Sequence, residues 1–196
     1  MRGSGAGALA DVSIRVEGSS ALSTSSRVAD GVLRIHRRRR LRRKEIAAYS
    51  EAIAAALGVD PFVGRDDIDL AEAGDWRLLL MDNQIQGLLL GDRPFLSIRG
   101  LLAHPALRRF VTVDMGAVRF IYNGADAMAP GITDADPSIQ IGDLVWVRDE
   151  RNLRPLAIGE ALLAGPEMVA SKQGKAVRSI HHVGDPLWKL DESPQE

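Results

Sequence analysis

A run of basic side chains between positions 34 and 44 is the strongest chemical feature of this 196-residue chain. Eight of these eleven positions are Arg or Lys, and none is acidic. Cations at this density repel one another, and phosphates relieve the repulsion because binding releases counterions from the polyanion. A solvated charged surface is the alternative. The run begins at Arg34 and predicts a phosphate-binding patch. The patch consists of Arg37, Arg38, Arg39, Arg40, Arg42, Arg43 and Lys44.

Residues for catalysis or metal binding do not occur in a usable arrangement. The chain has no cysteine, which excludes a disulfide framework and thiolate metal sites. His181 and His182 are adjacent, so on a strand they point to opposite faces and cannot hold one ion together. The acidic stretch Asp66–Asp69 is isolated and is expected to be solvated. No phosphate-binding loop, nucleophile elbow or zinc-protease motif is present. We therefore expect no enzyme activity, metal or cofactor.

The two halves of the chain differ in charge. Residues 1–109 carry 17 Lys and Arg against 13 Asp and Glu, whereas residues 110–196 carry 8 against 13. A basic first half and an acidic second half indicate two units that differ electrostatically. No apolar run approaches the roughly 18 residues that span a bilayer, so we expect a cytoplasmic protein without membrane contact.

The basic run leads into a predicted helix. Leu41, Ile46, Tyr49, Ile53 and Leu57 recur at helical spacing and Gly58 ends the pattern. Such a helix would direct the positive end of its dipole toward the anion that the arginines attract.

The rest of the first half predicts a small α+β domain over residues 32–108, preceded by a poorly defined arm over residues 1–31. Alternation at 12–16 makes one candidate strand in that arm. Residues 58–75 are expected to form a loop. The other expected elements are strands at 76–81 and 85–90 that form a hairpin, a turn at 91–92 that leads into 94–96, and a short helix at 97–104.

A complete structural unit is predicted from Val111 onward. A strand over 111–113 runs into Asp114, whose carboxylate can cap a following helix, and Asn123-Gly124 can end that helix. The chain then extends to a turn at Pro130-Gly131, with a positive φ expected at Gly131. A glycine at position 116, inside the helix, costs about 1 kcal/mol, which predicts close approach of another backbone or tight packing on a strand.

Later elements follow the same reasoning. Strands are predicted at 144–148 and 155–163, with Glu160 facing water, and a last strand at 176–183. Between them, a helical turn is expected to start at Gly165 and end at Gly174.

The run from Val113 to Ile132 resembles the opening strand, helix and second strand of a PUA domain, a small pseudo-barrel that binds structured RNA, often a tRNA acceptor end. The ending Ile180–Trp188 resembles the closing strand of archaeal PUA proteins and their eukaryotic relatives, the malignant T-cell-amplified sequence and translation machinery-associated proteins. The resemblance covers 110–190 and implies an α+β fold with a PUA domain over 109–191. Residues 32–108 resemble, more weakly, the basic pre-PUA domain that precedes it.

The resemblance also implies an RNA surface. Its glycines would admit the RNA backbone and its cations would meet phosphates. Because the second half is acidic, the arginines at 37–43 are expected to add attraction, so that both halves bind one RNA. The implied residues are Met115, Gly116 and Arg119 from the helix, Gly124, Ala125 and Asp126 from the turn, and Lys175, Arg178 and His181 from the last strand.

The leading hypothesis is a non-catalytic protein that binds structured RNA, tRNA or rRNA, in translation, with the ribosomal subunit or an initiation-factor-like protein as partner. A second hypothesis is a detached RNA-docking subunit of a modification enzyme such as archaeosine tRNA-guanine transglycosylase. A third is a protein-interaction module whose apolar hairpin at 76–96 docks a partner.

Overall fold

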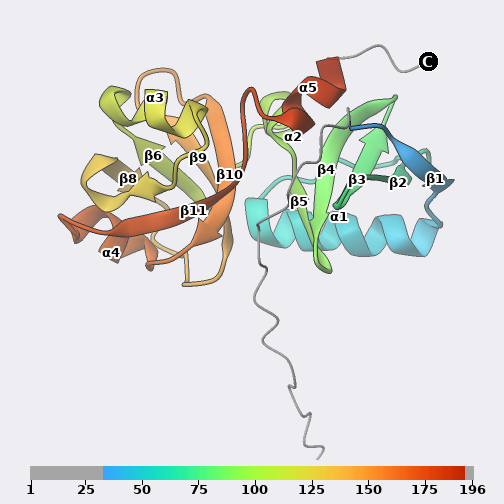
Figure 1. Ribbon diagram of the computed structural model, residues 1–196. Helices are drawn as coiled ribbons and strands as arrows, with labels where there is room; N and C mark the ends of the chain where they lie inside the picture. The colour runs from blue at the N-terminus through green and yellow to red at the C-terminus, as the bar shows by residue number, and fades with distance from the viewer. Residues whose placement is uncertain (1–32, 193–196) are drawn as a thin grey trace, which may run out of the picture.

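The computed structural model describes residues 33–192 of the chain. The expected N-terminal arm over 1–31, with its candidate strand at 12–16, lies outside the described residues. Two sheets lie side by side, each with helices around it, so the predicted α+β class is confirmed (Figure 1).

The first half forms a five-stranded antiparallel sheet in chain order. A long helix lies along this sheet and a short one follows its last strand (Figure 1). The strands are β1 (His36–Arg40), β2 (Asp69–Ala73), β3 (Trp76–Met81), β4 (Gln84–Leu90) and β5 (Arg93–Leu96), and the helices are α1 (Arg43–Leu57) and α2 (Ile98–Ala103).

The predicted helix and hairpin of this half are confirmed. Helix α1 buries Ile46, Ile53 and Leu57, and ends at Gly58 with φ of 73°. The β3–β4 turn uses Asp82 and Asn83, both with positive φ, as a two-residue hairpin turn requires.

Two strands of this sheet were not predicted. β1 is made of His36 and four arginines, all exposed, and its described strand partner is β2 alone. β2 lies inside the stretch 58–75, which was expected to form a loop. It was missed because Asp69 and Glu72 interrupt its apolar residues. Both strands exist because of pairing across the sheet, which local patterns do not report.

The second half forms a six-stranded sheet in the order β7-β11-β10-β9-β6-β8, in which β6 and β9 run parallel. Its strands are β6 (Phe110–Val113), β7 (Ala127–Met128), β8 (Ile132–Ala135), β9 (Leu144–Asp149), β10 (Pro155–Ala161) and β11 (Lys175–His182). Its helices are α3 (Met115–Tyr122), the 3-10 turn η1 (Ala129–Gly131), α4 (Gly165–Ala170) and α5 (Pro186–Glu192).

The strand-to-helix unit at the start of this sheet is confirmed. The Asp114 carboxylate accepts a hydrogen bond from the Ala117 amide at 2.8 Å, which caps α3. The expected positive φ at Gly131 is wrong, because residues 129–131 form a 3-10 turn. A Cβ at Gly131 would lie 3.1 Å from that of Ala117, so packing against α3 accounts for this glycine.

Three further expectations are corrected. Helix α4 ends at Ala170, four residues before Gly174, and α5 was not predicted. Glu160 is half-buried and accepts a 2.8 Å ion pair from Arg178 of the neighbouring strand, so it does not simply face water.

The two halves share a continuous apolar core. Leu144, Trp146 and Ile158 of the second sheet join the buried cluster of the first half. The Trp146 indole also donates to the Arg108 carbonyl at 2.8 Å, and Arg93 donates to the Gly142 carbonyl at 2.8 Å. These contacts hold the halves in one arrangement.

The apolar hairpin is part of this core. Leu78, Leu79 and Leu80 of β3 and Leu88 of β4 are at most 1% exposed. The hairpin therefore offers no apolar docking surface, which removes the feature behind the protein-interaction alternative.

Candidate nucleic-acid interface

Helix α3 presents most of its surface to solvent. Ile121 is its one buried residue, while Ala117 and Val118 are half-buried against the sheet. The Asp114 cap and the Asn123-Gly124 stop hold the helix to two turns. The exposed face carries one cation and no carboxylate, and consists of Met115, Gly116, Arg119, Phe120 and Tyr122.

Two of these side chains were missed by the sequence analysis. The chain has nine aromatic residues, all within the described range, and Phe120 and Tyr122 are the exposed ones, at 51% and 45%. The Arg119 guanidinium lies 4.6 Å from the centroid of the Phe120 ring. The signal in the sequence was weak, because positions 120 and 122 each lie about 100° around the helix from the buried Ile121, on the flanks of the inward face.

Gly116 lies on the open part of this face. A Cβ at this position would meet the Asp114 carboxylate oxygen at 3.1 Å, and no backbone approaches it. The tight packing on a strand that was considered for Gly116 is therefore absent, and the glycine leaves space on the solvent side.

The turn after α3 is occupied by the protein itself. Gly124 has φ of 80°, and a Cβ there would lie 2.8 Å from the His182 ring. Gly124 was expected to admit an RNA backbone, but contact with His182 by itself explains why a glycine stands here. The neighbouring Ala125 is exposed.

Asp126 fixes this turn to the last strand. Burial opposes its ionisation, but the hydrogen bonds from Lys175 at 2.8 Å and from the Ser179 amide at 2.9 Å lower the pKa of Asp126 below its ordinary value. Asp126 and Lys175 thus hold β7 and β11 together as an ion pair.

β11 contributes less to an interface than expected. Arg178 is paired with Glu160 at 2.8 Å. His181 is 2% exposed and bonds Asp185 at 2.7 Å, so the expectation that it faces RNA is wrong. Strand alternation turns His181 inward, and His182 takes the side near Gly124. His181 is therefore a buried structural histidine whose ring is hydrogen-bonded to Asp185.

The basic run is largely compensated by carboxylates far along the chain. Arg37 pairs with Glu72 at 3.0 Å, and Arg38 and Arg40 share Asp69 at 2.7 and 2.5 Å. Burial raises the pKa of Asp69, but the two arginines outweigh it and lower the pKa overall. Internal carboxylates therefore relieve much of the repulsion that phosphates were expected to relieve.

The helix start adds further pairs. Arg39 binds Glu45 at 2.7 Å, and Glu45 also accepts the Arg42 amide at 2.9 Å; the Arg39 hydrogen bond is the main reason that the pKa of Glu45 is lowered to about 2. Arg43 reaches Asp66 at 3.5 Å. Within residues 33–192, Arg42 and Lys44 have no ion-pair partner.

The basic run and α3 do not form one groove. Figure 1 shows β1 and the first turn of α1 at one end of the molecule and α3 at the other, with the length of α1 and the second sheet between them. One RNA can touch both surfaces only by extending along the molecule.

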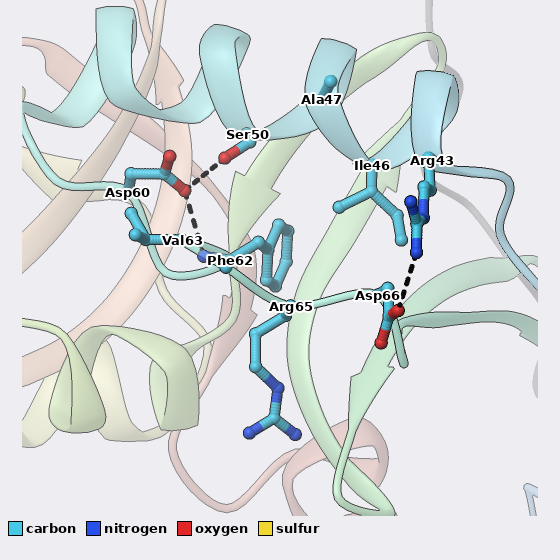
Figure 2. A pocket seen from close by; sticks show the side chains of 10 residues that line it. Arg43, Ile46, Ala47, Ser50, Asp60, Phe62, Val63, Arg65 and Asp66 are labelled. Carbon is cyan, nitrogen blue, oxygen red and sulfur yellow. Dashed lines mark hydrogen bonds and ion pairs between the residues drawn. The ribbon is translucent and has the colours of Figure 1, made fainter.

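A cavity of about 490 Å³ lies between α1 and the loop over 60–66 (Figure 2). Its polar groups are already bonded: the Ser50 hydroxyl donates to the Asp60 carboxylate, which also accepts the Phe62 amide at 2.9 Å. Arg43 and Asp66 close one end as an ion pair. These bonds anchor the loop to the helix.

Metal binding finds no support in the described part of the chain. No group of three or more His, Asp or Glu side chains there could hold an ion. The acidic stretch at 66–69 pairs with arginines instead: Asp67 binds Arg65 at 2.6 Å, and Asp69 binds the two arginines of β1. Between residues 33 and 192 no helix is long and apolar enough to cross a membrane.

Comparison with known proteins identifies the second half. The family model of the PUA domain matches residues 109–183. A conserved PUA domain protein of Thermoplasma acidophilum superimposes with a TM-score of 0.69 at 30% identity, over 79% of this chain and 99% of that one. A protein of Methanocaldococcus jannaschii is 34% identical over 76% of this chain and 88% of its own length. This chain is a PUA-domain protein.

The PUA-domain protein also has a eukaryotic relative with a functional name. Translation machinery-associated protein 20 of Saccharomyces cerevisiae is 30% identical over 64% of this chain and 74% of its own length. α3 is the helix of the PUA unit that was expected from Val113 onward. Of the residues that the resemblance implied for RNA, Met115, Gly116, Arg119 and Ala125 are exposed and have no internal ion pair in the described part of the chain.

Proposed function

We propose that this PUA-domain protein is a non-catalytic, cytoplasmic RNA-binding protein that recognises structured RNA, a tRNA acceptor end or rRNA, in translation. Its membership of the PUA family and its similarity to a translation machinery-associated protein support the proposal.

The observation that carries it is the chemistry of the α3 face. Arg119 supplies a cation for a phosphate, and exposed aromatic rings offer platforms on which unpaired bases stack. Met115 and Gly116 add an open surface without acidic side chains. An acidic domain whose exposed aromatic rings lie on one helix beside an exposed arginine is suited to an RNA end.

The basic run makes the second contact in this proposal. Arg42 and Lys44 are available for phosphates, and the paired arginines at 37–40 and 43 can exchange a carboxylate for a phosphate. α1, with 15 residues at about 1.5 Å each, is about 22 Å long, so the bound RNA must extend at least that far. A tRNA, or rRNA within a ribosomal subunit near an initiation-factor-like protein, meets this requirement.

Titration of the full chain with total tRNA at rising salt tests the proposal. Affinity should fall steeply with salt, and Arg119→Gln should weaken binding and reduce the slope by about 1, the value for one lost phosphate contact. Arg77→Gln, which removes an equal charge from β3 far from α3, is the control. Absence of binding at low salt, to tRNA and to rRNA fragments, would overturn the proposal.

A further inference from the structure

The loop between β9 and β10 carries positive charge to which the sequence analysis assigned no function. Arg151 and Arg154 are exposed, and neither has an ion-pair partner among residues 33–192. Lys175 and Arg178, which the family resemblance assigned to RNA, each hold a carboxylate at 2.8 Å. Available cations in this acidic domain are therefore found on the loop rather than on β11.

A buried carboxylate gives this loop a defined shape. Asp149 is 4% exposed and accepts hydrogen bonds from the backbone amides of Arg151, Asn152 and Arg154. Leu153 is held with φ of 55°, a conformation that costs energy for a non-glycine residue, and its side chain is half exposed. The loop is thus built to display its side chains outward.

The loop is also attached to α3. The Glu150 amide donates to the Val113 carbonyl at 3.0 Å, and the Glu150 carboxylate accepts the Met115 amide, the first of the helix, at 3.0 Å. Figure 1 places the connection between β9 and β10 beside α3. Glu150 is thereby engaged with the helix start, and the two arginines follow it within four residues.

We propose that Arg151 and Arg154 bind phosphates of the RNA strand that crosses α3, so that loop and helix form one interface. This inference rests on the proposed RNA-binding function. The loop supplies the electrostatic attraction, and α3 supplies the stacking surface. Because the amide bonds to Asp149 fix the loop before RNA arrives, little ordering is needed on binding.

The test is a salt titration of the full chain with total tRNA and, separately, rRNA fragments. Arg151→Gln with Arg154→Gln should lower the slope of log affinity against log salt by about 1.5 to 2, and lower affinity on the order of tenfold or more near 0.1 M salt. Lys172→Gln, which removes one exposed positive charge two residues after the end of α4, is the matched control for each arginine substitution made singly. Circular dichroism and urea unfolding report whether the variants fold.

The outcomes separate the two proposals. If the unchanged protein binds neither RNA, the proposed function fails and this inference fails with it. If it binds, and the double loop variant binds like the Lys172→Gln control while Lys175→Gln with Arg178→Gln loses affinity, the inference alone is overturned. If the double loop variant loses affinity while the β11 variant retains it, the result supports the inference.

Discussion

Glycines at 116 and 124 illustrate how one residue type serves different ends within ten positions. Gly116 faces solvent beside the Asp114 cap, whereas Gly124 has a positive φ and lies against His182. The first is open to a ligand, and the second is required by the fold.

Alanine at each position separates these roles. Gly116→Ala should change the free energy of unfolding by less than about 1 kcal/mol, since a gain in helix propensity is offset by the close Asp114 oxygen, yet it should weaken tRNA binding. Gly124→Ala should lower the free energy of unfolding by about 1 to 2 kcal/mol or more, because it meets both the strained φ and the His182 ring. Urea unfolding and tRNA titration measure both. Unchanged tRNA affinity in a stable Gly116→Ala protein would contradict RNA passage over α3.

At the scale of elements, buried carboxylates hold loops at both ends of strand β6 in the PUA domain. Burial of Asp149 opposes its ionisation, but the amides of Asn152, Arg154 and Arg151 outweigh this and lower its pKa. Asp136 does the same for the Arg109 amide and Ser138, with the same direction of pKa shift. The loops therefore depend on these side chains being ionised.

This dependence predicts loss of stability in acid. A lowered pKa in the folded state means that the stabilisation is present above the unfolded Asp pKa of about 3.9 and is lost as pH falls through the folded value. Urea midpoints should therefore hold between pH 7 and 5 and decrease below pH 4. A midpoint that rises on acidification would contradict the assignment.

Asp149→Asn tests one loop directly. Asparagine offers one acceptor oxygen in place of two, so the free energy of unfolding should decrease by about 1 to 3 kcal/mol. The acid-induced loss of stability should also become smaller than in the unchanged protein. Asp134→Asn, on an exposed carboxylate of β8, serves as the control. Equal unfolding midpoints for the two variants at neutral pH would show that the Asp149 bonds contribute nothing.

At the scale of the whole molecule, the charge is divided between two ends. The compensated arginine run lies at the end of α1 away from the PUA sheet, and α3 lies across that sheet (Figure 1). A shared apolar core through Trp146 and Ile158 keeps the two ends at a fixed separation. RNA length should therefore decide how many contacts form.

RNA of different lengths tests this separation. Arg42→Gln with Lys44→Gln should weaken binding of tRNA but leave binding of a hairpin shorter than α1 unchanged, whereas Arg119→Gln should weaken both. Salt titration of each RNA provides the measurement. If the Arg42 and Lys44 variant binds tRNA as tightly as the unchanged protein, the basic run does not bind RNA. It is then a solvated surface whose charges are balanced by internal carboxylates.

Local patterns predicted much of this fold. Helical spacing defined α1, the Asp114 cap and the Asn123-Gly124 stop defined α3, and the period of two with a short turn defined the β3–β4 hairpin. Each of these depends on residues within a few positions of one another. β1 was not predicted, because its partner β2 lies about thirty positions away. β2 was not predicted although it also pairs with the neighbouring β3, because Asp69 and Glu72 interrupt its apolar residues.

The sequence alone determined that this protein has a dense cationic run, a capped helix after Val113 and no cysteine chemistry, because composition and neighbouring residues suffice for these features. Tertiary structure alone decided that Glu72 and Asp69 compensate the run, that His181 is buried, and that His182 covers Gly124. These contacts join residues 29 to 58 positions apart, and only the folded chain brings such groups within bonding distance.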